Sequence, residues 1–189
     1  MATALFIDEQ YIKDTSYLDE NVDVKLIAPI IAEAQDIHIH TLLGTALYNE
    51  VSAQIIAGTL TALNTTLVNT YCAKSLKYWV MYEGVDVFNF KFTNKAIIKR
   101  TSEHGNAVET SDVKRLMDRL KDKAEWYDKR LVNYLCENSA SYPLYLSSGN
   151  GVDDIIPNRN VFTTGIYLGN TYKYIDKADL YENPKANNY

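Results

Sequence analysis

The chain has 189 residues, of which 47% are hydrophobic and 23% are charged, and its formal net charge is -5. This length and composition are typical of a soluble globular protein with one domain and an appendage, and they exclude disordered and fibrous classes. The negative charge argues against a protein that coats DNA through bulk electrostatics, although it is compatible with a local basic patch. Tyrosine is in excess, with fifteen residues against five phenylalanines, and tyrosine is favoured at protein interfaces.

The first half of the chain predicts three helices. Residues 1–20 are expected to form an extended lead-in to a helix that Asp23 caps and Gly44 ends, because apolar residues between them recur at steps of three or four. Pro29 must either kink this helix or mark its first turn. A shorter helix is predicted at about 45–57, before Gly58. The third, at about 65–87, is apolar around much of its circumference and is therefore expected to be central.

The second half predicts one long helix and an appendage. Phe88, Phe90 and Phe92 alternate in a segment that indicates a loop or loose hairpin. Ser111 is expected to cap a helix of about 26 residues with a heptad-like apolar series. Pro143 ends the helical part. The sequence thus predicts an all-α bundle of about four helices over residues 1–146. Residues 147–189 are expected to form an irregular or small β extension that mediates assembly contacts, with a hairpin near 161–169.

No catalytic, cofactor or metal site is predicted. The sequence contains no GxxxxGK[ST], GxGxxG, GxSxG or HExxH motif. His38 and His40 lie two residues apart on a helix, so their side chains point to different sides and cannot share one ion. Cys72 and Cys136 lack metal-ligand spacing and are expected to be two buried thiols in a reducing cytosol. We therefore expect a protein that is not an enzyme.

One polar cluster is a candidate binding site. Four cations within ten residues are interleaved with two aromatic residues. Such a loop is most simply solvated, but it could also face DNA or an acidic partner while the aromatic residues dock on a neighbour. The cations are Lys91, Lys95, Lys99 and Arg100, and the aromatic residues are Phe90 and Phe92.

Three stretches together resemble a known family. They are AQDIHIHTLLGTALYNEV at 34–51, NKAIIKRTSEHG at 94–105 and LKDKAEWYDKRLVNYLCENSASYPLY at 120–145. They are similar to the small helical head-to-tail connector proteins of tailed bacteriophages, in the form found in phages of Bacteroidetes hosts, including the crAss-like phages. The resemblance covers roughly residues 5–146.

The resemblance implies an all-helical subunit of a homo-oligomeric ring, a dodecamer in the neck of the virion, made in the host bacterial cytoplasm. One face would contact the portal protein and the other a stopper or tail ring protein. Genomic double-stranded DNA would pass through the lumen without sequence specificity during packaging and ejection, and no membrane would be involved. The resemblance implies no catalytic residue. It assigns helix-turn-helix packing to four motif residues: Leu43, Gly44, Leu47 and Tyr48.

The appendage lies outside the shared motifs. We expect Gly149 to Tyr189 to become ordered on assembly by reaching a neighbouring subunit or the next ring. Its interface anchors would be Phe162, Tyr167, Tyr172 and Tyr174.

Two other functions stay open at this point. The first is a helical nucleic-acid-binding or regulatory domain that uses the basic loop 91–100, and strongly salt-dependent affinity for free duplex DNA would indicate it. The second is a small-molecule enzyme, which would need a polar pocket with two convergent titratable groups.

Overall fold

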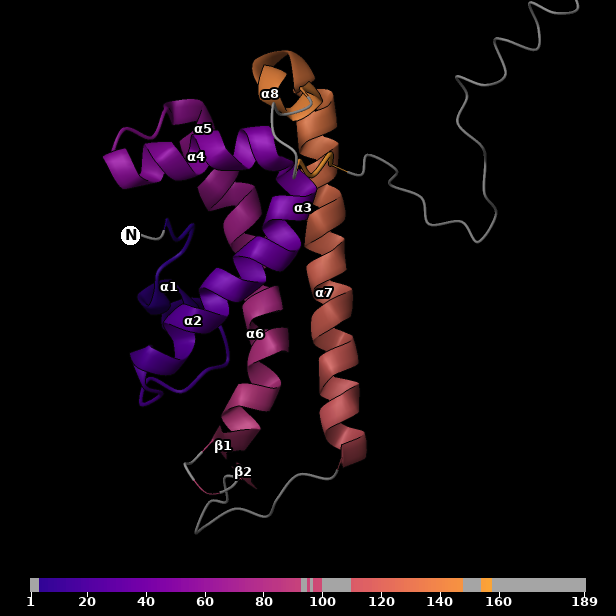
Figure 1. Cartoon of the computed structure of the whole chain (residues 1–189). Helices are drawn as coiled ribbons and strands as arrows, with labels where there is room; N and C mark the ends of the chain where they lie inside the picture. The colour runs from indigo at the N-terminus through magenta and orange to yellow at the C-terminus, as the bar shows by residue number, and fades with distance from the viewer. Residues whose placement is uncertain (1–3, 93–94, 96, 100–109, 148–153, 158–189) are drawn as a thin grey trace, which may run out of the picture. The chain divides into compact units, whose positions relative to one another are not determined.

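The computed structural model describes residues 4–92, 95, 97–99, 110–147 and 154–157 (Figure 1). These residues are mostly helical, which confirms the predicted all-α class. They contain six helices, whereas about four were predicted. The two additional helices, at Glu9–Thr15 and Pro143–Leu146, are too short to show an apolar period, and Pro143 begins the last helix instead of ending the helical part. Two of the helices contain a π-helical segment: α2 Val24–Ala34 continues through η1 Gln35–Ile39 into α3 His40–Leu43, and α5 Ala62–Thr66 continues through η2 Leu67–Cys72 into α6 Ala73–Asn89. The other four helices are α1 Glu9–Thr15, α4 Thr45–Ala57, α7 Thr110–Glu137 and α8 Pro143–Leu146. A 3-10 turn, η3 Ser139–Ser141, lies between α7 and α8.

The N-terminal segment differs from the expected extended lead-in, because it contains α1. The Asp8 carboxylate accepts a hydrogen bond from the Tyr11 backbone N–H at 2.7 Å and so caps α1. Ile12 is fully buried, and α1 contacts α2. A helix of seven residues, or about two turns, is too short to show an apolar period in the sequence, which explains the error.

Helix α2 begins as predicted. Asp23 accepts a hydrogen bond from the Lys25 N–H at 3.0 Å, which confirms the cap. Pro29 lies inside the helix rather than in its first turn. The helix continues through η1 and α3 and ends at Gly44, where φ is +76°. Helix α4 likewise ends at Gly58, where φ is +65°, so both predicted glycine stops are confirmed.

Helix α6 occupies the centre of the bundle, as its apolar circumference predicted. It contacts α2 and α7, which lie on different sides of it (Figure 1). Leu76 is fully buried and Val80 almost so. The continuous helix formed by α5, η2 and α6 starts three residues earlier than expected, at Ala62, because Thr61 accepts a hydrogen bond from the Asn64 N–H and caps α5.

The predicted hairpin is present at the end of α6. Strands β1 (Phe90–Phe92) and β2 (Ile97–Lys99) are antiparallel, with Lys91 opposite Ile98. Helix α7 then runs for 28 residues from Thr110. Ser111 therefore lies within the helix and does not cap it.

The cysteines differ from each other in burial. Cys72 is buried in the core and Cys136 is exposed. The expectation of two buried thiols is wrong for Cys136, because the position of α7 that it occupies faces away from the other helices. Burial raises the pKa of the Cys72 thiol well above its ordinary value, so this cysteine stays a neutral core residue.

Gly44 forms the corner between α3 and α4 and is itself buried. The Thr45 N–H donates to the Ile155 carbonyl at 3.0 Å, and the Ile155 N–H donates to Thr45 Oγ1 at 2.9 Å. Leu43 and Leu47 are buried beside this corner. Residues 154–157 therefore lie against the helices, whereas residues 148–153 and 158–189 of the predicted extension are outside the described part of the chain.

A buried polar network attaches the N-terminal segment to this corner. The Gln35 amide donates to Tyr48 Oη and to the Ala4 carbonyl, each at 2.8 Å, and accepts from the Phe6 N–H at 2.8 Å. The Tyr48 hydroxyl donates to Asp36 at 2.6 Å. Burial, with the Asp36 bond, raises the pKa of Tyr48 to about 12. Every polar group of Gln35 is thus satisfied in the core, as buried amides require.

In the part of the chain that the structure describes, no single helix is long and apolar enough to cross a membrane. By length and composition alone, the pair Thr45–Ala57 and Ala62–Asn89 passes the same test when taken together, with a bend of 102° between its members.

The corner predicts a large difference between two glycine substitutions. A Cβ at Gly44 would lie 2.6 Å from Pro157 Cδ and would also strain a positive φ, whereas a Cβ at Gly58 meets no atom within 4 Å. We expect Gly44→Ala to lower the free energy of unfolding by about 3 kcal/mol and Gly58→Ala by about 1 kcal/mol, the cost of the left-handed backbone alone. Urea denaturation measures both, and equal losses would contradict the packing described for Gly44.

Candidate protein-interaction site

A half-buried carboxylate lies between α6 and α7. Asp128 accepts hydrogen bonds from the Ser75 hydroxyl and from Trp79 Nε1, the latter at 3.1 Å to Oδ2. Burial raises the pKa of Asp128 to about 6, and the two hydrogen bonds oppose that rise. Because both donors are neutral and are held by the helix interface, this cluster joins α7 to α6 and carries no evident chemistry of its own.

The two histidines that precede the corner have separate partners. His38 Nε2 lies 2.9 Å from Glu83 Oε1, and the His38 ring stacks on Trp79 at 3.6 Å between centroids. The His40 ring stacks on Tyr48 at 4.3 Å, and its Nε2 lies 3.0 Å from Thr45 Oγ1. Within the described residues, no group of three His, Cys, Asp or Glu side chains could hold a metal ion.

Stacked tyrosine pairs cross from α6 and η2 to α7. Tyr71 stacks on Tyr134 with 3.9 Å between ring centroids, and Tyr78 stacks on Tyr127 with 5.4 Å. Each pair joins one residue from each helix. The partners on one helix are seven residues apart, which is about two turns, so both pairs lie along the same seam.

Cations cover these rings. The Arg130 guanidinium lies 5.5 Å from the Tyr71 centroid, and Lys77 and Lys123 lie 4.8 and 5.6 Å from that of Tyr78. Such distances allow cation–π attraction. Burial lowers the pKa of Lys77, and the neighbouring Lys74 and Lys123 lower it further. We call this set the tyrosine–cation ladder: Tyr71, Tyr78, Tyr127, Tyr134, Lys77, Lys123 and Arg130.

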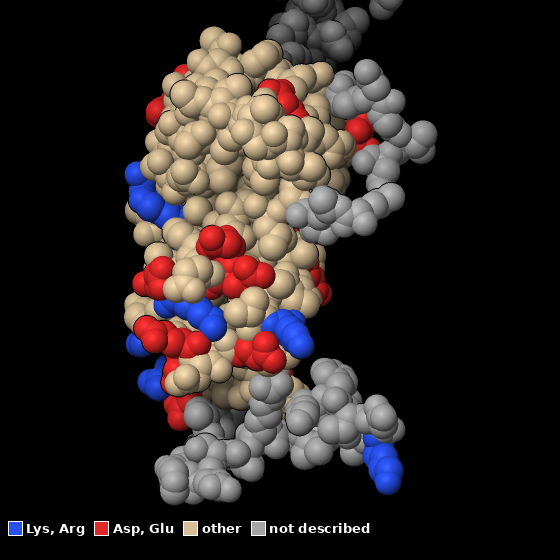
Figure 2. Space-filling model, turned by 90° about the vertical axis from the view of Figure 1, so that its left-hand side faces the viewer, with Lys and Arg blue, Asp and Glu red and all other residues tan. Residues whose placement is uncertain are grey.

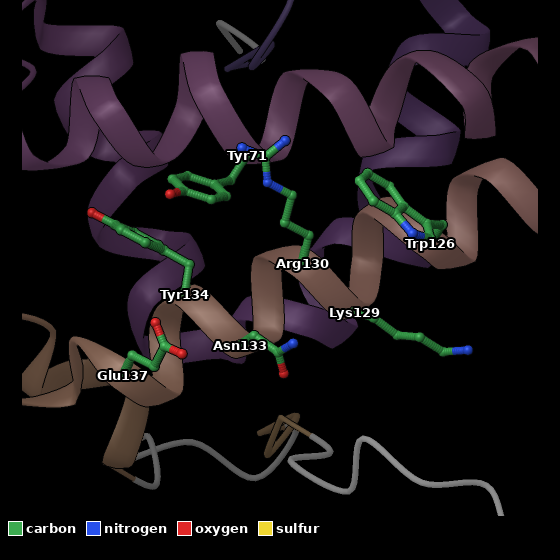
Figure 3. Close-up of a pocket in the computed structure, with 7 residues that line it drawn as sticks. All are labelled: Tyr71, Trp126, Lys129, Arg130, Asn133, Tyr134 and Glu137. Atoms are coloured by element: carbon green, nitrogen blue, oxygen red, sulfur yellow. The ribbon is translucent and has the colours of Figure 1, made fainter.

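One end of the ladder opens into a groove of about 400 Å³. Arg130 and Tyr134 point toward Tyr71, whereas Lys129 points away from it (Figure 3). Trp126 stands beside them and is 58% exposed. The complete lining is Tyr71, Trp126, Lys129, Arg130, Asn133, Tyr134 and Glu137. Its two cations outnumber its one carboxylate, and Trp, Tyr and Arg are the residues that dominate the binding energy of protein interfaces.

A second surface, on α4 and α5, is almost without charge. Between Thr41 and Ala73 the sequence contains one charged residue, Glu50. Ile56 and Leu63 are nevertheless 57% and 40% exposed. Figure 2 shows this part of the face, above α1 and α2, as a nearly continuous area without Lys, Arg, Asp or Glu, while charged side chains gather lower down. Depletion of charge is typical of the centre of a protein interface.

The predicted basic loop is described only in part. Lys95 and Phe90 are exposed. The register pairs Lys99 with Phe90 and Lys91 with Ile98, so the two strand lysines are not cross-strand partners of each other. Phe92 pairs with Ile97. Arg100 and the four predicted anchors of the extension lie outside the described residues, and these functional assignments stay predictions.

Sequence reasoning missed the ladder and Trp126. Tyr71, Tyr127 and Tyr134 belong to the apolar series of the two long predicted helices, but each is only half-buried. The seven-residue spacing of tyrosines in both helices, with a basic residue close to each pair, is the signal that could have indicated the seam.

These observations define an all-α protein with a candidate protein-interaction site on α7. The chain belongs to the family described as "Family of unknown function (DUF6712)", whose model matches residues 39–155. That region includes the Gly44 corner, α6 and α7. Neither the curated proteins nor the solved structures include a match to the chain.

Asp128 predicts a loss of stability with rising pH. Its folded-state pKa of about 6 lies above the ordinary value of 3.8. Well below pH 3.8 the carboxyl is protonated in both the folded and the unfolded chain, whereas above pH 6 folding must bury a carboxylate. The free energy of unfolding should therefore fall by about 2 kcal/mol on this account as the pH rises from 4 to 7.

The Asp128→Asn variant has no carboxylate at this position and so removes the cost of burying one above pH 6. Relative to the unaltered protein, its stability should improve by about 2 kcal/mol between pH 4 and pH 7, as measured by urea denaturation at each pH. Asp118→Asn, which removes an exposed carboxylate from the same helix, is the matched control for the change in charge. A stability difference for Asp128→Asn that stays constant over this range would refute the account.

Proposed function

We propose that this protein is a structural subunit of a head-to-tail connector ring in the virion of a tailed bacteriophage, of the type found in phages of Bacteroidetes hosts. Its partners would be other copies of itself, the portal protein and a stopper or tail ring protein. The motif residues of the resemblance support this proposal. Leu43, Gly44, Leu47 and Tyr48 lie together at the corner between α3 and α4, and the stretch 120–145 forms most of α7 and the start of α8.

The observation that carries the proposal is the presence of two surfaces with interface chemistry on different elements of one small bundle. The α7 groove presents Trp126, Arg130 and Tyr134, and the α4–α5 surface presents Ile56 and Leu63 with almost no charge. A ring subunit needs lateral contacts with its neighbours and axial contacts with the next ring, so it needs separate surfaces of this kind.

DNA contacts are assigned to the hairpin in this proposal. Lys95 is exposed there, and Lys91 and Lys99 lie on the two strands. A conduit favours weak contacts with phosphate, because the genome has to slide through it. The extension 147–189 is proposed to contact a neighbouring subunit or the next ring, and no catalytic role is assigned to any residue.

Assembly tests the proposal directly. The purified protein, at tens of micromolar and mixed with the portal protein encoded in the same genome, should form rings or a defined portal complex in negative stain, with a matching mass by native mass spectrometry. Free duplex DNA should bind poorly, as the acidic net charge requires. A persistent monomer that ignores the portal but binds duplex DNA with steep salt dependence would instead establish the nucleic-acid-binding alternative.

Trp126 provides a residue-level test. Because this side chain is largely exposed, Trp126→Ala should change the free energy of unfolding by less than about 0.5 kcal/mol. It should nevertheless weaken assembly about tenfold or more, since an exposed tryptophan in a groove is a typical interface anchor. Leu116→Ala on the same helix, where Leu116 is 52% exposed but outside the groove, is the matched control. If Trp126→Ala assembles as well as Leu116→Ala, the groove is not part of the interface.

A further inference from the structure

We propose that the groove end of the tyrosine–cation ladder binds the acidic α1–α2 side of a second copy of this chain. This contact would be the lateral interface of the ring, so the inference rests on the proposed function. It names the partner of the groove and the surface of that partner.

The acidic side is formed by the N-terminal elements. Eight acidic and two basic residues lie between Asp8 and Asp36, so this segment carries more negative charge than the whole chain carries net. Glu20, Asp23 and Glu33 are exposed, and Val24, next to Asp23 in the sequence, is exposed as well. Figure 2 shows acidic side chains over this part of the molecule, with basic side chains between them. The side thus combines carboxylates with an apolar contact.

The groove offers the complementary chemistry. Lys129 and Arg130 supply two cations, Trp126 supplies an exposed apolar ring, and Glu137 is the one carboxylate of the lining. A guanidinium held over an aromatic ring, as Arg130 is over Tyr71, retains donors for a carboxylate from another molecule. Complementary charge of this kind fixes which surfaces meet and excludes like-charged pairings.

The geometry of the bundle favours a head-to-tail contact. Helix α2 packs on α6 from one side and α7 from another (Figure 1), so the carboxylates of α2 and the groove on α7 belong to helices on different sides of α6. Two copies related by a twofold axis through the groove would place cations against cations. A contact between unlike faces repeats from subunit to subunit and closes into a ring when the rotation permits.

The same features favour a protein over DNA as the occupant of the groove. The faces of Tyr71 and Tyr134 are stacked on each other at 3.9 Å, so these faces are not available to nucleic-acid bases. The α1–α2 carboxylates of the same subunit would also repel phosphate. An acidic protein surface with an apolar contact satisfies both the cations and Trp126.

Charge reversal tests the contact. One variant carries Lys129→Glu and Arg130→Glu, and a second carries Glu20→Lys and Glu33→Lys. All four side chains are exposed, so thermal unfolding should show intact folds. Each variant alone should self-associate about tenfold or more weakly than the unaltered chain, measured by sedimentation velocity with and without portal protein.

Restoration is the decisive arm of the experiment. A chain with all four changes, or an equal mixture of the two variants, restores opposite charges across every contact and should recover assembly to within about threefold of the unaltered chain. The control, Lys114→Glu with Lys121→Glu, reverses two exposed cations of α7 outside the groove and should leave assembly unchanged.

The failures are distinguishable. Rings that form from each charge-reversed variant as readily as from the unaltered chain would overturn this inference and leave the connector function standing. Loss of duplex DNA binding by the Lys129→Glu, Arg130→Glu variant, with self-association unchanged, would overturn it in favour of DNA as the occupant. An unaltered chain that stays monomeric with and without portal would overturn the proposed function together with the inference.

Discussion

The packing of α6 between α2 and α7 is the constraint on which the other features depend. Leu76 and Val80 fill the buried sides of α6, and the Asp128 carboxylate of α7 accepts hydrogen bonds from Ser75 and Trp79. With these residues fixed at the interface, Tyr71 and Tyr78 are left along its edge, where they meet tyrosines of α7. The ladder is therefore a consequence of how the two long helices are aligned, and it holds its cations in position.

The corner at Gly44 is the second constraint, and it lies at the end of the helix formed by α2, η1 and α3. Its positive φ turns the chain into α4, and the backbone bonds between Thr45 and Ile155 bring residues 154–157 to the same place. Gln35 and Tyr48 attach the N-terminal segment nearby. Segments far apart in sequence thus converge on one corner, and the α4–α5 surface, which is almost without charge, begins there. The bundle holds its two candidate interaction surfaces on separate, well-anchored elements.

Much of this fold could be predicted because its signals are local. The cap at Asp23, the stops at Gly44 and Gly58, the central helix and the hairpin follow from residue types a few positions apart. Helix α1 is too short to carry a period, and the exposure of Cys136 depends on where α7 lies. The groove is also non-local, since Tyr71 and Tyr134 meet only when η2 and α7 pack. The apolar period of a helix indicates that a tyrosine faces a neighbouring helix, but it does not indicate that one edge of the ring remains exposed to solvent.

The most direct test of the central claim is zero-length carbodiimide cross-linking of assembled protein prepared from equal parts of ¹⁴N- and ¹⁵N-labelled chains, because mixed-isotope peptides identify contacts between subunits. The account predicts mixed-isotope links that join Lys129 to carboxylates between Glu20 and Glu33. Assemblies in which Lys129 forms no link between subunits, or in which its links lead only to the portal, would contradict the claim that the α7 groove is the lateral interface of a ring.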